Sequence, residues 1–200
     1  MKFVVGIDEV GRGPLAGPVT VCAVACEEGI YKKLKHSRGL PPVGKDSKKL
    51  KREDREKYDK ILRELSLDGK INFKIVHISN KIIDARGISF AIRQALFKSL
   101  SDLKINPNSS KVLLDGGLKA PLEFKSQKTI IKGDEKERII SWASILAKVS
   151  RDSLMQKAGI KFPEYGFELH KGYGTLKHRE SIKKHGISSF HRITFCKNYG

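Results

Sequence analysis

Carboxylates end three separate short apolar stretches of this 200-residue chain. Asp8 and Glu9 end the first stretch, Asp115 ends the second, and Asp134 follows the third. If these ends face one crevice, the charges repel, by roughly 4 kcal/mol for two unit charges ~4 Å apart at an effective dielectric constant of 20. Such a cluster persists when it is protonated or when it binds cations. Oxygen ligands select hard ions, so we expect Mg²⁺ or Mn²⁺ at these carboxylates.

A structural role is the alternative interpretation for each of these acids taken singly. Asp is common beside Gly in turns, and Asp at a helix start caps free amide groups. This alternative is strongest for Asp134, which lies where the N-cap of the following helix is expected. Asp8 and Glu9 are adjacent acids at the end of an apolar strand, where capping has no evident use, so metal binding is favoured there.

The elements that must position these acids follow from the hydrophobic pattern. Short β-rich or alternating runs predict strands at residues 3–7, 19–26, 71–77, 112–114 and 129–131. Helical spacing predicts helices over residues 51–65, 80–103, 135–158 and 175–185. Asp46 or Ser47 is expected to cap the first of these helices, and Gly87 is the weak point of the second. The pattern indicates an α/β domain in which four acids lie at the ends of three strands.

Composition limits the class of protein. Lys and Arg total 40 and Asp and Glu total 22, a net charge of +18, which predicts a polyanionic partner. The apolar run at residues 19–26 is far shorter than the ~20 residues of a membrane-spanning helix, so no membrane association is expected. The N-terminal apolar stretch stops at Asp8, unlike a signal peptide. Three cysteines without a Cys-x-x-Cys pair indicate a reducing compartment, and we expect a cytoplasmic protein.

Residues 11–16 also fit the dinucleotide-binding pattern G-x-G-x-x-A. That site requires a helix directly after the glycines, so that the helix N-terminus meets the pyrophosphate. Residues 17–21 read Gly-Pro-Val-Thr-Val, which is typical of a strand. The pattern therefore predicts no dinucleotide site.

Seven blocks of the sequence closely resemble, in order, the motifs of the ribonuclease HII family. They are residues 6–19, 46–50, 114–116, 132–134, 144–152, 170–175 and 191–195. The blocks extend over nearly the whole chain, and the fourteen-residue first block (GIDEVGRGPLAGPV) is a highly specific match. Trp142 departs from the family pattern, in which a small Ala is usual, so the helix around it must pack differently.

The resemblance implies a ribonuclease H-like fold, a mixed five-stranded sheet flanked by helices, with a C-terminal helical and loop extension. We expect one catalytic domain over residues 1–200, in which residues 160–200 form the substrate-binding extension. The implied activity is endonucleolytic hydrolysis of RNA in RNA–DNA hybrids, with cleavage 5′ of single ribonucleotides in duplex DNA. The implied catalytic and metal-binding residues are Asp8, Glu9, Asp115 and Asp134, which would hold two ions, Mg²⁺ or Mn²⁺. The expected products carry 3′-hydroxyl and 5′-phosphate ends.

The loop Gly11-Arg12-Gly13 is the candidate for recognising the ribose, since two glycines let backbone groups approach a sugar closely. A simple tight turn is the alternative. By resemblance this loop and Tyr173 read the junction, with Tyr173 stacking on the sugar of the following deoxynucleotide. Ser47 and Lys48 are candidates for binding a phosphate, and Lys148 with Arg151 for contacting the nucleic-acid backbone. His170 is a further candidate, because it lies in the matched block that contains Tyr173, residues 170–175, called the Tyr173 block below. Asp152 is predicted to be a structural acid near Lys148 and Arg151.

Other functional classes fit the residues less well. A basic, non-catalytic nucleic-acid-binding protein explains the charge of +18 but not four placed carboxylates. A type I ribonuclease H or a Holliday-junction resolvase lacks the Gly-Arg-Gly loop and the Tyr173 block. A ribonuclease HIII carries an extra N-terminal domain, whereas only seven residues precede Asp8 here. We expect a protein that acts on RNA–DNA hybrids and on DNA duplexes containing ribonucleotides, and we expect it to be a monomer.

Overall fold

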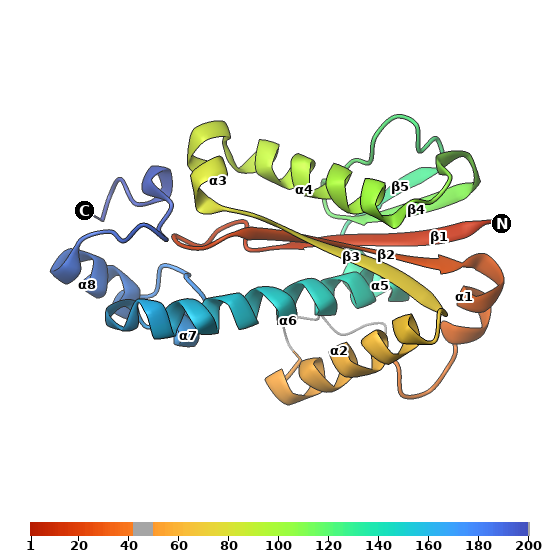
Figure 1. Cartoon of the computed structure of the whole chain (residues 1–200), viewed down its shortest axis with the longest axis horizontal. Helices are drawn as coiled ribbons and strands as arrows, with labels where there is room; N and C mark the ends of the chain where they lie inside the picture. Colours follow the sequence, from red (N-terminus) through yellow and green to blue (C-terminus); the bar gives the residue numbers. More distant parts are fainter. Residues whose placement is uncertain (42–49, 200) are drawn as a thin grey trace.

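Five strands form one mixed sheet in the computed structural model, which describes residues 1–41 and 50–199 (Figure 1). The strands are β1 (Phe3–Val10), β2 (Val19–Glu27), β3 (Ile71–Ile78), β4 (Ser110–Asp115) and β5 (Gln127–Ile130), in the order β3-β2-β1-β4-β5. β2 pairs antiparallel with β1 and β3, whereas β4 runs parallel to β1 and β5. The predicted mixed five-stranded α/β fold is confirmed.

Helices cover both faces of this sheet (Figure 1). One face packs against α3 (Asn80–Arg86) and α4 (Ile88–Leu103), and the other against α6 (Arg138–Lys161), with α1 (Glu28–Leu34) and α2 (Arg52–Leu67) beside it. β2 is buried on both sides from Val19 to Cys26. A strand with two covered faces must be apolar at consecutive positions, which is why its sequence does not alternate.

The predicted helices differ from the observed ones at two backbone breaks. The helix expected over residues 80–103 is divided at Gly87, whose φ of +81° suits glycine and ends α3. The helix expected from residue 135 is divided at Glu137, whose extended backbone separates the short α5 (Gly133–Lys136) from α6. The expected caps Asp46 and Ser47 lie outside the described residues, and the N-cap position of α2 is Lys51.

Trp142 is accommodated inside the layer between α6 and the sheet. Its side chain has no exposed surface, and its ring meets the Tyr31 ring of α1 edge to face, with centroids 5.8 Å apart. Such edge-to-face pairs are favoured by the charge distribution of aromatic rings. The sequence predicted that the packing around residue 142 must adapt to a large ring, and the contact with α1 provides this adaptation.

The C-terminal elements return to the segment that follows β1. They are η3 (Pro163–Tyr165), α7 (Phe167–His170), α8 (Leu176–His185) and η4 (Ile193–Phe195), at the C-terminal end of α6 (Figure 1). The Leu15 amide donates to the Gly172 carbonyl over 2.8 Å, and the Arg192 amide donates to the Leu15 carbonyl over 2.7 Å. These bonds bring the predicted Tyr173 block next to the loop that leaves β1.

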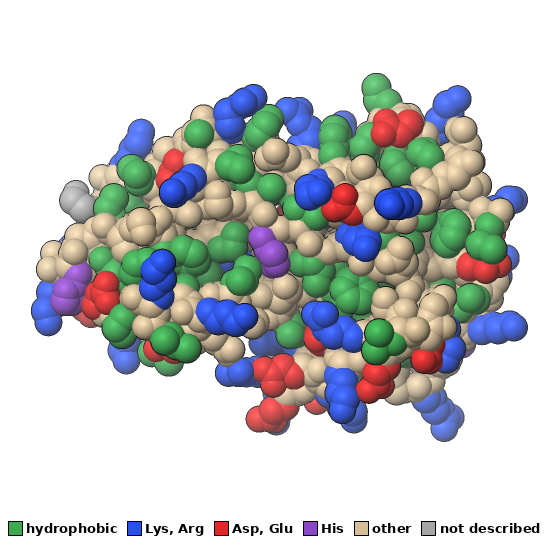
Figure 2. Space-filling view, in the orientation of Figure 1, with side chains coloured by type: hydrophobic (Ala, Val, Ile, Leu, Met, Phe, Trp, Pro, Cys, Tyr) green, Lys and Arg blue, Asp and Glu red, His purple; other side chains and the backbone are tan. Residues whose placement is uncertain are grey.

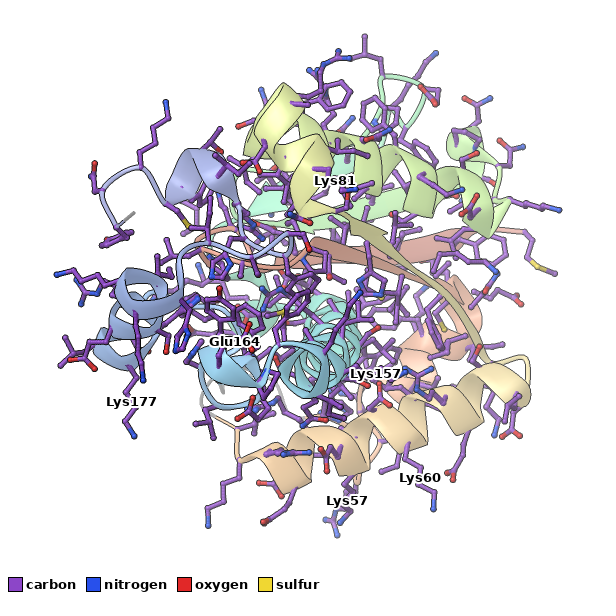
Figure 3. All side chains as sticks on the ribbon, turned by 60° about the vertical axis from the view of Figure 1, so that its left-hand side comes forward. Lys57, Lys60, Lys81, Lys157, Glu164 and Lys177 are labelled. Carbon is purple, nitrogen blue, oxygen red and sulfur yellow. The ribbon has the colours of Figure 1, made fainter. Side chains whose placement is uncertain are left out.

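Positive side chains cover much of the surface. Figure 2 shows Lys and Arg spread over the visible face, with many of the acids gathered along α2. Lys57 and Lys60 project outward from α2, and Lys177 projects outward from α8 (Figure 3). None of the described helices is both long enough and apolar enough to cross a bilayer.

Candidate active site

Three of the four predicted carboxylates meet where β1 and β4 end. Asp8 and Glu9 lie near the end of β1, and Asp115 is the last residue of β4. Ile7 pairs with Leu114 in the parallel ladder, so Asp8 and Asp115 follow the last paired residues of neighbouring strands. One carboxylate oxygen from each of the three acids lies within 4.8 Å of the others. The parallel pairing of β1 and β4 thus produces the predicted cluster.

Asp134 reaches this region from α5 rather than from a strand end. The Gly133 amide donates to Asp115 Oδ1 over 2.6 Å, which places the residue before Asp134 against the cluster. Asp134 is buried in the first turn of α5, and Lys132 occupies the N-cap position considered for it. The close group formed by the described acids contains Asp8, Glu9 and Asp115 but not Asp134.

Asp8 lies at the centre of the electrostatics. Its side chain is 4% exposed, and burial raises its pKa well above the usual value, as do the charges of Glu9 and Asp115. The Ser144 hydroxyl of α6 and the Glu9 amide, which donates to Asp8 Oδ1 over 2.7 Å, act in the opposite direction. Hard oxygen donors whose charges repel one another fit a divalent cation, because the cation would neutralise them.

The packing of α6 on β1 brings Ser144 toward Asp8. Gly6 permits this close approach, because a Cβ atom there would lie 2.4 Å from the carbonyl carbon and oxygen of Ile139. No side chain larger than hydrogen fits this contact without movement of the backbone. The glycine two residues before Asp8 therefore determines how closely α6 approaches the acids.

The loop Gly11-Arg12-Gly13 continues directly from β1. Gly11 has a φ of +88°, and a Cβ atom there would lie 2.2 Å from Nε of Arg151, so both conformation and space require glycine. The Arg12 side chain is exposed, with Nη1 3.8 Å from Oε1 of Glu9. The predicted ribose-recognising loop therefore lies at the edge of the acidic cluster.

Tyr173 is 43% exposed, and hydrogen bonds hold its backbone on both sides. Its amide donates to the His170 carbonyl over 3.0 Å, and its carbonyl lies 2.9 Å from Nδ1 of His178. His170 is half-buried, with one ring nitrogen 2.7 Å from the Tyr165 carbonyl and the other 3.2 Å from the Gly172 amide. His170 thus supports the turn that carries Tyr173.

The remaining predicted contacts have varied outcomes. Lys148 forms an ion pair with Asp152 at 2.8 Å, which agrees with the structural role predicted for Asp152. Arg151 was expected to contact a nucleic-acid backbone, and this expectation is wrong because its side chain is fully buried. Ser47 and Lys48 lie outside the described residues.

Arg192 is a residue of this region to which the sequence assigned no role. It has no exposed surface and donates to the carbonyls of Gly11, Arg12 and Gly17 over 2.7, 3.0 and 2.9 Å. Burial, and then the charge of Arg151, lower its pKa to about 9, so it remains a cation at neutral pH. Its place in the matched block at residues 191–195 was the available signal, but an arginine in a basic chain gives no indication of burial.

Comparison with known proteins decides the family. The family model described as Ribonuclease HII matches residues 5–198. The chain belongs to the ribonuclease HII family. The ribonuclease HII of Clostridium beijerinckii is 42% identical over 194 residues, which cover 97% of this chain and 67% of that protein. The ribonuclease HII of Caldicellulosiruptor bescii is 41% identical over 198 residues, covering 98% and 88%.

A solved structure agrees with this assignment. Ribonuclease H2 from Pyrococcus horikoshii superposes with a TM-score of 0.75 at 26% identity, covering 98% of this chain and all of that chain. Enzymes of the ribonuclease HII family are metal-dependent nucleases that hydrolyse RNA in RNA–DNA hybrids. The chain is therefore a type 2 ribonuclease H, as the sequence motifs predicted.

Proposed function

We propose that this ribonuclease HII cuts the RNA strand of RNA–DNA hybrids and also cuts 5′ of a single ribonucleotide in duplex DNA. The observation that carries the proposal is the continuity of β1 with the glycine loop. Glu9 and Gly11 are two residues apart, so two of the candidate metal ligands, Asp8 and Glu9, lie on the strand that leads directly into the candidate ribose-recognising loop. A ribose held at the loop would lie beside the acids, and the proposed products carry 3′-hydroxyl and 5′-phosphate ends.

The proposed catalytic residues are Asp8, Glu9, Asp115 and Asp134, which would hold two divalent ions, Mg²⁺ or Mn²⁺. When bound, such ions supply an activated water and neutralise charge on the leaving oxygen. The protein contributes the positions of the ligands. Asp8 and Asp115 are fixed by neighbouring strands, and the Gly133 amide orients the Asp115 carboxylate.

Recognition of the substrate is assigned to groups around the acids. Backbone groups of Gly11, Arg12 and Gly13 would contact the 2′-hydroxyl, the group that separates RNA from DNA at one position. The exposed ring of Tyr173 would stack on the sugar of the following deoxynucleotide. Ser47, Lys48 and Lys148 would hold phosphates and His170 would support the Tyr173 turn, within an overall charge of +18 that favours a polyanion.

The working unit is proposed to be a cytoplasmic monomer in which residues 1–200 form one domain, with residues 160–200 as its substrate-binding extension. Hydrogen bonds between Leu15 and both Gly172 and Arg192 support a single unit. Cys22, Cys26 and Cys196 are free and buried, which suits a reducing compartment.

The test uses a labelled DNA duplex that contains one ribonucleotide, with Mg²⁺, Mn²⁺ or EDTA. We expect the wild-type protein to make one cut 5′ of the ribonucleotide in either ion and none in EDTA. Asp8→Asn should bind the duplex as the wild type does but lose cleavage below detection, because one anionic ligand becomes neutral. Gel-shift and cleavage assays measure both quantities.

Asp68→Asn is the matched control, since Asp68 pairs with Lys70 at the surface, and it should cut at the wild-type rate. Wild-type cleavage by Asp8→Asn would overturn the catalytic assignment. A wild-type protein that cuts a continuous RNA–DNA hybrid but leaves the single ribonucleotide intact would overturn the narrower substrate proposal.

A further inference from the structure

Two fully buried arginines bind the segment that carries the ribose-recognising loop. Arg192 donates to the carbonyls of Gly11, Arg12 and Gly17, and the charged group of Arg151 lies close to it. Arg151 donates to the carbonyls of Pro18, Ala16 and Lys171 over 2.9, 3.3 and 3.0 Å. Five of these six acceptors lie in residues 11–18.

The partners of these arginines are unusual for buried cations. Within the described residues, neither Arg151 nor Arg192 has a carboxylate oxygen within 4.0 Å, so neutral carbonyls satisfy both guanidinium groups. Burying a charge without a counter-charge is unfavourable. A planar guanidinium can donate to several carbonyls in a fixed fork, whereas a lysine ammonium cannot reproduce that geometry. The two side chains are therefore suited to fixing the direction of several carbonyls at once.

The direction of these carbonyls determines the direction of the loop amides. In a trans peptide the carbonyl and the following N–H point in opposite directions, and the described chain contains no cis peptide. The carbonyls of Gly11 and Arg12 point at Arg192, so the amides of Arg12 and Gly13 point away from it. Neither amide donates a hydrogen bond to another described residue. Arg192 thus leaves two amide donors available on the outer side of the loop.

The same arrangement connects the loop to Tyr173. Arg151 joins the carbonyls of Ala16 and Pro18 to that of Lys171, two residues before Tyr173. Gly172 packs so closely on the loop that a Cβ atom there would lie 2.6 Å from the Ala16 carbonyl oxygen. The loop and the Tyr173 turn are therefore held in one fixed relation by groups that the substrate does not contact.

We infer that Arg192 and Arg151 are positioning residues that orient the Arg12 and Gly13 amides and the Tyr173 ring for reading a ribonucleotide at the cleavage point. The inference rests on the proposed function. The two arginines hold the loop in its binding conformation before the substrate arrives, and the carboxylates bind the metal. A displacement of about 1 Å in such a positioning group can lower the rate by roughly 100-fold.

The experiment compares wild type, Arg192→Lys and Arg151→Lys on the duplex with one ribonucleotide. We expect kcat to fall by roughly 100-fold in Arg192→Lys, with KM and the calorimetric Mn²⁺ affinity close to wild type. Amide NMR shifts should change at residues 11–18 and 171–173 and stay constant in the rest of the sheet. Added guanidinium should partly restore kcat to Arg192→Ala, because it would refill the vacated position.

Arg63→Lys is the matched control, because Arg63 pairs with Asp59 on α2, and it should retain wild-type kcat. Wild-type kcat in folded Arg192→Lys and Arg151→Lys would overturn the inference, and so would a loss of Mn²⁺ affinity that parallels the loss of kcat. If Arg192→Lys does not fold, Arg151→Lys provides the decision. A wild-type protein that cannot cut this duplex would overturn the proposed function itself, which is a different result.

Discussion

The carboxyl group of Asp8 has two acidic neighbours and almost no contact with solvent. Because its pKa is raised in the folded state, the unfolded chain ionises first as the pH rises. The free energy of unfolding therefore decreases as the pH rises from the unfolded pKa to the folded pKa. At neutral pH the metal-free cluster of acids destabilises the protein. A divalent cation bound by the folded state would reverse this effect.

Asp115→Asn should raise the thermal midpoint of the metal-free protein by a few degrees, about 2–4 °C for each kcal/mol gained. The change removes one like charge from Asp8, while the amide oxygen can still accept from the Gly133 amide. Thermal unfolding in EDTA and in Mn²⁺ measures the effect, and the stabilisation by Mn²⁺ should shrink in the variant. Asp102→Asn, which loses a surface pair with Lys98, should show no gain. A lower midpoint for Asp115→Asn in EDTA would contradict this account of the cluster.

The contact between α6 and β1 is the element-scale feature that holds the acids beside Ser144. Gly6 allows the backbone of α6 to touch β1, and Gly11 allows Arg151 of α6 to reach the loop. Both glycines appear in the first motif block, but their neighbours, Ile139 and Arg151, lie more than 130 residues away in the chain. A single helix thus supports two parts of the candidate site.

Gly6→Ala should lower the free energy of unfolding by about 1–3 kcal/mol or more, since the added methyl meets backbone that cannot move away easily. Gly29→Ala is the matched control, because Gly29 lies in α1 with open space around a Cβ atom. The control should gain about 0.5–1 kcal/mol from lower backbone entropy in the unfolded chain. Urea unfolding measures both variants, and equal stabilities would refute the close-packing argument.

At the scale of the whole molecule, buried histidines connect the C-terminal elements to one another and to Tyr173. His191 Nδ1 accepts from the Ser188 amide over 2.9 Å, so its Nε2 carries the proton and donates to His178 Nε2 over 3.0 Å. His178 Nδ1 in turn donates to the Tyr173 carbonyl. Both rings must be neutral for this chain of bonds, and burial lowers the pKa of each to about 4.

Acidification should therefore weaken the folded protein between pH 6.5 and 4. In this range the unfolded histidines bind protons and the folded ones do not, so stability falls as the pH falls, by up to about 1.4 kcal/mol per unit for each histidine. Thermal unfolding from pH 7 to pH 5 should show a falling midpoint, with a shallower slope in His178→Gln. The stability contribution of Asp8 changes with pH in the opposite direction, but Asp8 is present in both proteins, so the difference between their slopes reports on His178. His36 is exposed, and His36→Gln should keep the wild-type slope. Equal slopes for wild type and His178→Gln would contradict the histidine assignment.

The strands, most of the helices, the family and the identity of the clustered acids could all be predicted from the amino-acid sequence. Hydrophobic periodicity is local, so it located β1 and β4 and the acids Asp8 and Asp115 at their ends. The same pattern singled out Asp134, and motif order then supplied the glycine loop and Tyr173 as candidates. Local pattern did not reveal the break at Glu137, because that residue has no glycine or proline signal.

Which charged residues are buried, and which groups they bind, became visible in the three-dimensional packing. Arg192 and Gly11 are 181 positions apart, and Arg151 and Pro18 are 133 apart, yet both pairs are hydrogen-bonded. Burial of a guanidinium depends on carbonyls that converge from distant segments, and no local pattern encodes that convergence. The same holds for His178 and His191, whose protonation depends on the groups packed around them. The residue types therefore predicted an acidic site for divalent metal ions, and the long-range packing determined how the buried arginines and histidines around it are oriented.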